Sequence, residues 1–136
     1  MSKLQWLYGK KLQNSDAITE FEKELNIQFP PEYKKIVSQY DGGTPVPQFF
    51  STADNTEKVF NYLIKASQIQ EMFRSLCREF NSDLLLVPFA DDPAGNFICF
   101  DFTTNKSNPQ VVFFDLDVGQ SAVVTSDFNA FLNEIH

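Results

Sequence analysis

Between positions 84 and 125 the apolar residues repeat with a period of two, in four short runs divided by turn residues. The runs are LLLVPFA (84–90), FICFDF (97–102), VVFFDLD (111–117) and SAVVT (121–125). Such runs are typical of β-strands, and the breaks at 92–96, 105–109 and Gly119 carry the residues that favour turns. Because connections this short join antiparallel neighbours, the runs predict an antiparallel meander.

A first helix is predicted ahead of this sheet. Ser15 or Asp16 can cap it, since both side chains accept hydrogen bonds from the free N–H groups of a first turn. Ile18, Phe21 and Leu25 then fall on one face, at the spacing of a short amphipathic helix.

A second helix is bounded by prolines and glycines in FPPEYKKIVSQYDGG (29–43). Pro30 and Pro31 suit a helix start, because the N–H that proline lacks would have no partner there. Gly42 and Gly43, after Asp41, accept the left-handed geometry that ends a helix. The apolar face between these limits consists of Tyr33, Ile36, Val37 and Tyr40.

Two more helices and one more strand complete the prediction. Ser67 is expected to cap a third helix, whose broad buried face consists of Ile69, Met72, Phe73, Leu76, Cys77 and Phe80. Ser126 is expected to cap a last helix over 127–135, and VFNYLI (59–64) is predicted to be a strand. Helices at both ends of a meander predict an α+β fold, with an antiparallel sheet packed by helices on one face.

The pairing of the second and third runs decides which side chains share a face. A hairpin symmetric about Lys106 gives one apolar face, consisting of Ile98, Phe100, Phe102, Val112, Phe114 and Leu116. The other face is mixed and holds Phe97, Cys99, Asp101, Val111, Phe113, Asp115 and Asp117. Either more chain covers this mixed face, or it is an acidic binding surface with apolar anchors.

The 136 residues fit a single domain, 1–136, and the 15 phenylalanines supply bulk for one core. Cys77 and Cys99 lie in apolar runs without CxxC spacing, so we expect reduced core thiols and a cytoplasmic protein. No stretch approaches the roughly 20 apolar residues of a membrane span. Trp6 and Tyr8 lie near Lys10 and Lys11, and we expect them to pack on the domain, not to bind nucleic acid.

The net charge of −7 comes mostly from one window of the sequence. Residues 83–127 carry seven aspartates against the single base Lys106, whereas residues 1–82 carry ten acids and ten bases. A negative field repels nucleic acid and membrane phosphates, and it attracts a basic protein partner. The charge is equally compatible with a role in solubility alone.

The chain offers little for catalysis. A hydroxyl or thiol nucleophile needs an imidazole beside it, and the only histidine is His136, at the last position. Paired aspartates could act as acid and base or hold a hard cation, but Asp91 and Asp92 precede a turn, where aspartate commonly bonds the backbone. We therefore expect no enzymatic activity, no cofactor and no metal.

The order of these segments resembles the SUKH superfamily, the Smi-type domain of many bacterial immunity proteins. The resemblance runs from Ile18 to Leu132 and rests on Phe29-Pro30, on Tyr33 three residues later, on Asp41-Gly42-Gly43, on VPFADDPAGNFICFDF and on the closing FNAFL. One departure is Ala94-Gly95-Asn96, where relatives often carry adjacent glycines. The resemblance implies an α+β fold and a non-enzymatic protein that binds and neutralises a cognate toxin, often a nuclease.

Two groups of residues are the expected partner contacts. The first follows the second helix and consists of Asp41, Phe49, Phe50 and Asp54; the second is the acidic hairpin region, with Asp91, Asp92, Asp101, Asp115 and Asp117. The expected partner is a basic toxin protein, with no nucleic acid or membrane partner. The alternative is a regulatory or scaffold module without a toxin partner, and the oligomeric state stays open.

Overall fold

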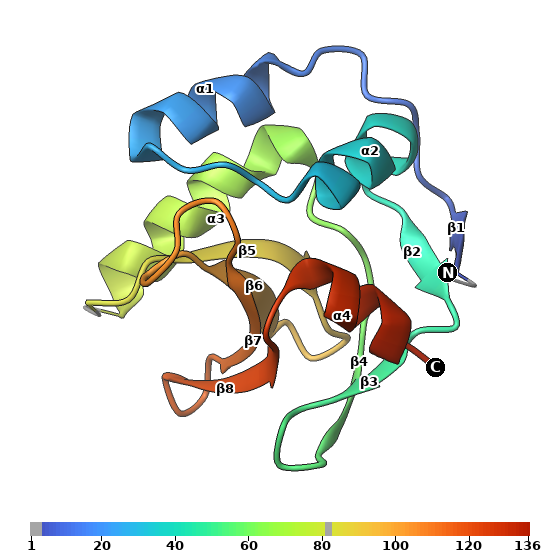
Figure 1. Cartoon of the computed structure of the whole chain (residues 1–136), viewed down its shortest axis with the longest axis vertical. Helices are drawn as coiled ribbons and strands as arrows, with labels where there is room; N and C mark the ends of the chain where they lie inside the picture. Colours follow the sequence, from blue (N-terminus) through green and yellow to red (C-terminus); the bar gives the residue numbers. More distant parts are fainter. Residues whose placement is uncertain (1–3, 81–82) are drawn as a thin grey trace.

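The computed structural model describes residues 4–80 and 83–136, which form four helices and eight strands (Figure 1). In chain order these are β1 (Gln5–Leu7), α1 (Asp16–Leu25), α2 (Pro31–Tyr40), β2 (Thr44–Val46), β3 (Phe49–Ser51), β4 (Glu57–Val59), α3 (Ala66–Glu79), β5 (Leu86–Asp91), β6 (Phe97–Asp101), β7 (Gln110–Asp115), β8 (Gln120–Thr125) and α4 (Phe128–Glu134). The four-stranded sheet has the order β5-β6-β7-β8 with every pair antiparallel. The predicted α+β meander is confirmed.

Helix α2 begins and ends where its flanking residues predict, but the side chain of Ser15 makes no capping hydrogen bond at α1, where the Asp16 N–H donates to Asn14 Oδ1 at 2.9 Å. Helix α1 starts after Ser15 and ends at Asn26, which adopts the left-handed conformation at φ 55°. Helix α2 starts at Pro31, and Gly42 follows its end with φ 76°. Strands β1 and β2, each three residues long, pair with each other and were not predicted, because such short segments carry no periodic signal.

The predicted caps of the last two helices are wrong by one residue or more. The first N–H of α3, at Ala66, donates to Asp41 Oδ1 at 2.8 Å, so a residue distant in sequence replaces Ser67 as the cap. The cap of α4 is Asp127, which accepts from the Ala130 N–H at 2.8 Å, and not Ser126. The predicted strand at 59–64 is also wrong, since β4 ends at Val59 and beyond it only Leu63 forms an isolated bridge, with Ala90.

The register of the β6–β7 hairpin differs by one residue from the prediction. Ile98 pairs with Phe113 and Phe100 with Val111, so the hairpin is centred between Asn105 and Lys106. Asn105 Oδ1 accepts the N–H groups of Ser107 and Asn108, at 3.0 and 2.9 Å. These hydrogen bonds hold the turn in a register that is shifted by one residue from the register symmetric about Lys106. A slip of one residue exchanges the two faces of a strand.

The corrected register assigns the aromatic residues of β7 to different faces. Val111 and Phe113 join Ile98 and Phe100 in the main core. Val112 and Phe114 lie with Cys99 in a second, smaller cluster on the opposite face. The predicted mixed face is therefore wrong, because Cys99 lies on one face of the sheet and Val111 and Phe113 lie on the other.

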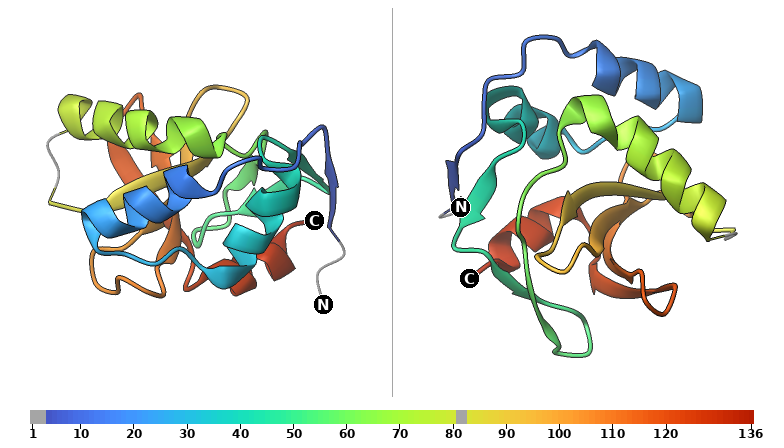
Figure 2. Two further views of the ribbon diagram at one scale, coloured as in Figure 1. Left: turned by 90° about the horizontal axis from the view of Figure 1, so that it is seen from above. Right: turned by 180° about the vertical axis from the view of Figure 1, so that it is seen from behind.

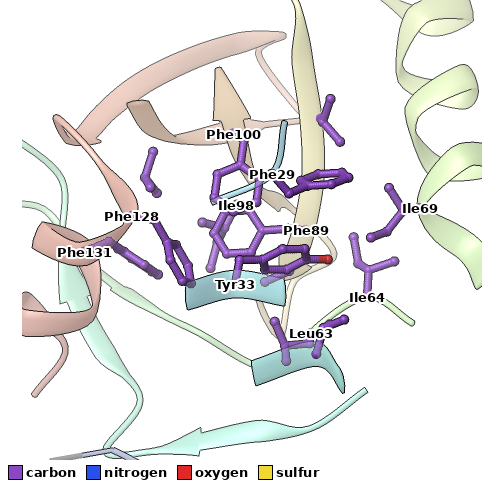
Figure 3. Packing of buried hydrophobic residues seen from close by; sticks show 14 of the residues in the cluster. Phe29, Tyr33, Leu63, Ile64, Ile69, Phe89, Ile98, Phe100, Phe128 and Phe131 are labelled. Carbon is purple, nitrogen blue, oxygen red and sulfur yellow. The ribbon is translucent and has the colours of Figure 1, made fainter. Parts of the chain in front are cut away.

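The main core is an aromatic cluster in which α2, α4 and the sheet meet (Figure 3). The rings of Phe89 and Phe100, on neighbouring strands, stack with centroids 4.1 Å apart. Tyr33 from α2 and Phe128 from α4 meet Phe100 edge to face, at 5.2 and 5.4 Å. Contacts of this geometry add to the stabilisation from burial, so the cluster fixes both helices on the sheet.

The second cluster is covered by α3, which packs along β5 (Figure 2). Leu76 of α3 packs there against Leu86, Cys99, Val112 and Phe114. Cys77, by contrast, is exposed, so only Cys99 is a core thiol, and both cysteines are free. The apolar side chains on this face of the sheet are thus covered by more of the chain.

Tyr33 allows a test of the packing in the main core. Its hydroxyl is buried, has no hydrogen-bond partner among the described residues and points toward Ile64 and Ile69 (Figure 3). We expect Tyr33→Phe to raise the free energy of unfolding by about 1 kcal/mol, because it removes a buried polar group that lacks a partner. Urea denaturation measures this change.

Tyr62→Phe is the matched control, since Tyr62 is 40% exposed and its hydroxyl can bond to water. Its free energy of unfolding should stay within about 0.5 kcal/mol of the wild type. A loss of stability in Tyr33→Phe would contradict the assignment of an unpartnered hydroxyl.

Candidate functional site

The meander brings four of the predicted aspartates to one end of the sheet. Alternate connections of a meander lie at the same end, so the β5–β6 turn, with Asp91 and Asp92, lies at the same end as the β7–β8 turn, with Asp115 and Asp117. The Leu116 N–H donates to Asn96 Oδ1 at 3.0 Å and ties the two turns together. Both turns lie along the lower side of the view from behind in Figure 2.

The β3–β4 hairpin adds a fifth carboxylate, that of Asp54. The Ala53 N–H donates to the Val123 carbonyl of β8 at 2.8 Å, which holds this hairpin against the sheet. Asp54 and Asp115 line a shared cavity of about 190 Å³, with Phe113 in its wall. We call Asp54, Asp91, Asp92, Asp115 and Asp117 the acidic end.

The cavity at the acidic end already accommodates a cation of the chain itself. The ammonium group of Lys58 lies 4.4 Å from the centroid of the Phe113 ring, a cation–π contact. An ammonium group therefore fits against the aromatic wall of the cavity that Asp54 and Asp115 also line.

Several of these carboxylates also build their own turns. Asp92 Oδ1 accepts the N–H groups of Ala94 and Asn96, at 3.0 and 2.8 Å. Asp115 Oδ1 accepts the Asp117 N–H at 2.9 Å, and Asp54 accepts the Thr56 N–H at 3.3 Å. Each of these carboxylates keeps at least one further lone pair, so the turns hold them in place and leave part of their capacity to accept hydrogen bonds.

The environments of Asp54 and Asp91 shift their pKa values in opposite directions. Hydrogen bonds from Thr52 and Thr56 lower the pKa of Asp54, because they stabilise its charged form. Partial burial raises the pKa of Asp91, although the Tyr62 N–H donates to its Oδ1 at 3.2 Å. Burial therefore disfavours the charged form of Asp91.

The structure separates the remaining predicted contacts from the acidic end. Asp101 lies at the opposite end of β6, where it accepts the Thr103 N–H at 2.9 Å. Asp41 lies beside Lys10 and caps α3 through Ala66. Phe50 is fully buried in the main core and so is not a surface contact, whereas its neighbour Phe49 is 41% exposed.

Two apolar side chains at the acidic end were not among the predicted contacts. Tyr62 is 40% exposed and is held beside Asp91 by main-chain hydrogen bonds. Val118 is 64% exposed at the tip of the β7–β8 turn and lines the cavity with Asp115. Tyr62 lies in the run 59–64, which the sequence wrongly predicts to be a strand, whereas the turn predicted at Gly119 places Val118 at the surface.

Two other features, a cluster of metal ligands and a membrane-spanning helix, are absent from the part of the chain that the structure describes. The described residues contain no group of three or more His, Cys, Asp or Glu placed to hold a metal ion. None of the helices in 4–80 and 83–136 has the length and apolarity needed to cross a bilayer.

The chain matches the model of a known protein family. The model of the SMI1/KNR4 family (SUKH-1) matches residues 14–134, which is nearly the whole chain. No curated protein matches the sequence.

The turn hydrogen bonds separate the aspartates by their expected effect on stability. Asp92→Ala should lower the free energy of unfolding by about 1–2 kcal/mol, because two backbone N–H groups lose a charged acceptor. Asp117→Ala, at an exposed position, should change it by less than about 0.5 kcal/mol. Equal losses in urea denaturation of the two variants would contradict this division.

The raised pKa of Asp91 predicts a pH dependence. A carboxyl whose pKa is higher in the folded state favours folding when it is protonated, and this contribution is lost as the pH rises through the folded pKa. Asp91→Asn should therefore be more stable than the wild type at pH 7, and the difference should shrink as the pH falls toward about 4. Denaturation curves at several pH values test this; a variant that is less stable at pH 7 would contradict it.

Proposed function

Because the chain belongs to the SMI1/KNR4 family (SUKH-1), we propose that it is a non-enzymatic immunity protein that binds and neutralises a cognate toxin domain in the cytoplasm. The single observation that carries the choice of surface is the acidic end, where three connections of the chain bring five carboxylates to one end of the sheet. The proposed partner is a basic protein, of which a nuclease is the leading case.

The proposed mechanism is steric and electrostatic blockade. A nuclease must present cationic side chains to the phosphates of its substrate, and carboxylates can occupy the same positions. The acidic end offers them from short turns held by hydrogen bonds, so little conformational freedom is lost on binding. Tyr62 and Val118 lie beside the carboxylates and supply exposed apolar area for the centre of such an interface.

The Lys58 contact suggests how a partner's cation would be received. Lys58 lies over Phe113 in the cavity lined by Asp54 and Asp115. A lysine or arginine of the toxin would compete for this cavity, and Lys58 would then move toward solvent. The cavity lined by Asp54 and Asp115 thereby offers one defined position for a cationic side chain of the partner.

The double variant Asp115→Lys/Asp117→Lys tests this surface. We expect association with a toxin domain that binds the wild type to slow by about tenfold or more at low salt, because charge reversal weakens electrostatic steering. The salt dependence of the association rate should also flatten. Stopped-flow fluorescence over a range of salt concentrations measures both effects.

Asp16→Lys/Glu20→Lys is the control, with the same change in charge at exposed positions of α1 on the other side of the molecule (Figure 1). Its association rate should stay within about threefold of the wild type, because steering decays with distance in salt. If association slowed equally in both variants, the effect would come from the net charge of the protein, and the acidic end would not be the binding surface. Failure of the wild type to bind any neighbouring toxin would favour the regulatory or scaffold alternative.

A further inference from the structure

A second cavity, of about 390 Å³, lies between residues 8–14, the end of α2 and the start of α3. Lys10, Lys11 and Lys65 line it, against the single carboxylate of Asp41. In a protein of net charge −7, this is a local excess of positive charge. We call it the lysine cavity.

The carboxylate in the lysine cavity is already engaged. Asp41 Oδ1 accepts the Ala66 N–H at 2.8 Å. Among the described residues, the ion pairs join Lys34 to Glu22, Lys35 to Glu32, Arg74 to Glu24 and His136 to Glu57. The lysines of the cavity are thus absent from the ion pairs of the described chain.

Main-chain contacts fix the segments that carry these lysines. Lys10 and Asp41 exchange two backbone hydrogen bonds, of 3.1 and 2.9 Å, and the Leu12 N–H donates to the Ser38 carbonyl at 2.9 Å. On the other side, the stem of Lys65 lies across Gly42, where an added Cβ would be 3.3 Å from Lys65 Cγ and 3.5 Å from Cε. The segments that carry the lysines are therefore held on two sides of one cavity.

Tyr8 contributes an aromatic ring to the rim of the lysine cavity. The sequence predicts that Trp6 and Tyr8 both pack on the domain, but only Trp6 does, with its ring 5.7 Å from Phe60. Tyr8 is 79% exposed and lines the cavity, as does Ser67. Two hydroxyl donors thus accompany three ammonium groups.

We propose that the lysine cavity binds a phosphate group of a small molecule. Ammonium groups that face one space repel each other, and an anion between them relieves this repulsion. Phosphate offers several acceptor oxygens and up to two negative charges, which matches three cations and two hydroxyl donors better than a single carboxylate does. The site is independent of the acidic end and of the proposed toxin.

Inorganic phosphate and pyrophosphate are the probes for this site. In ¹H–¹⁵N correlation spectra at constant ionic strength, we expect saturable shifts at residues 8–14, Gly42 and 65–67, with half-saturation at about 1 mM or below. Lys65→Gln should weaken binding by about tenfold, and Lys11→Gln/Lys65→Gln should remove saturation. Both lysines are exposed, so the variants should keep the dispersed spectrum of the folded protein.

Lys106→Gln is the matched control, because it removes a lysine from the loop between β6 and β7 and should leave phosphate binding unchanged. Chloride and glutamate at the same ionic strength complete the experiment. The proposal is overturned by shifts that do not saturate, by equal saturation with chloride, or by binding that survives loss of both lysines. Tighter binding of glutamate than of phosphate would overturn the assignment to phosphate.

Discussion

The stacked rings of Phe89 and Phe100 are the contact on which the rest of the structure depends. They join β5, an edge strand of the sheet, to its neighbour β6, and Tyr33 of α2 and Phe128 of α4 pack on them. The helices and the sheet share this one cluster, so the turns at the sheet's end extend from a fixed frame. The acidic end is therefore positioned before any partner arrives.

This frame carries charges of opposite sign on separate surfaces. The acidic end consists of turns of the sheet and of the β3–β4 hairpin, whereas the lysine cavity lies where residues 8–14 meet the ends of two helices. Asp41, the carboxylate in the lysine cavity, has a structural role. Its main chain exchanges two hydrogen bonds with Lys10, and its side chain caps α3. The surfaces proposed for a basic protein and for a phosphate group are therefore separate, so the two proposed ligands would not compete for the same residues.

The sequence predicts the periodic features well and the unique contacts poorly. Proline and glycine mark both limits of α2, and the period-two runs give β5–β8 to within about two residues, because both signals are local. The β6–β7 register is missed because the Asn105 hydrogen bonds, and not symmetry, centre the turn. The capping of α3 by Asp41 joins residues 25 positions apart, and the exposure of Tyr8 also depends on tertiary contacts. Of the predicted contacts, the turns of the meander bring four aspartates together, but Asp41, Asp101 and Phe50 lie elsewhere.

Hydrogen exchange of the chain with and without the proposed toxin partner tests the central claim most directly, namely that a preformed acidic end is the binding surface. Amides of residues 52–58, 92–96 and 115–121 should exchange more slowly in the complex, whereas those of 8–14 and 65–67 should not change. Protection confined to the region of the lysine cavity or to α1, with the three acidic connections unaffected, would contradict the account.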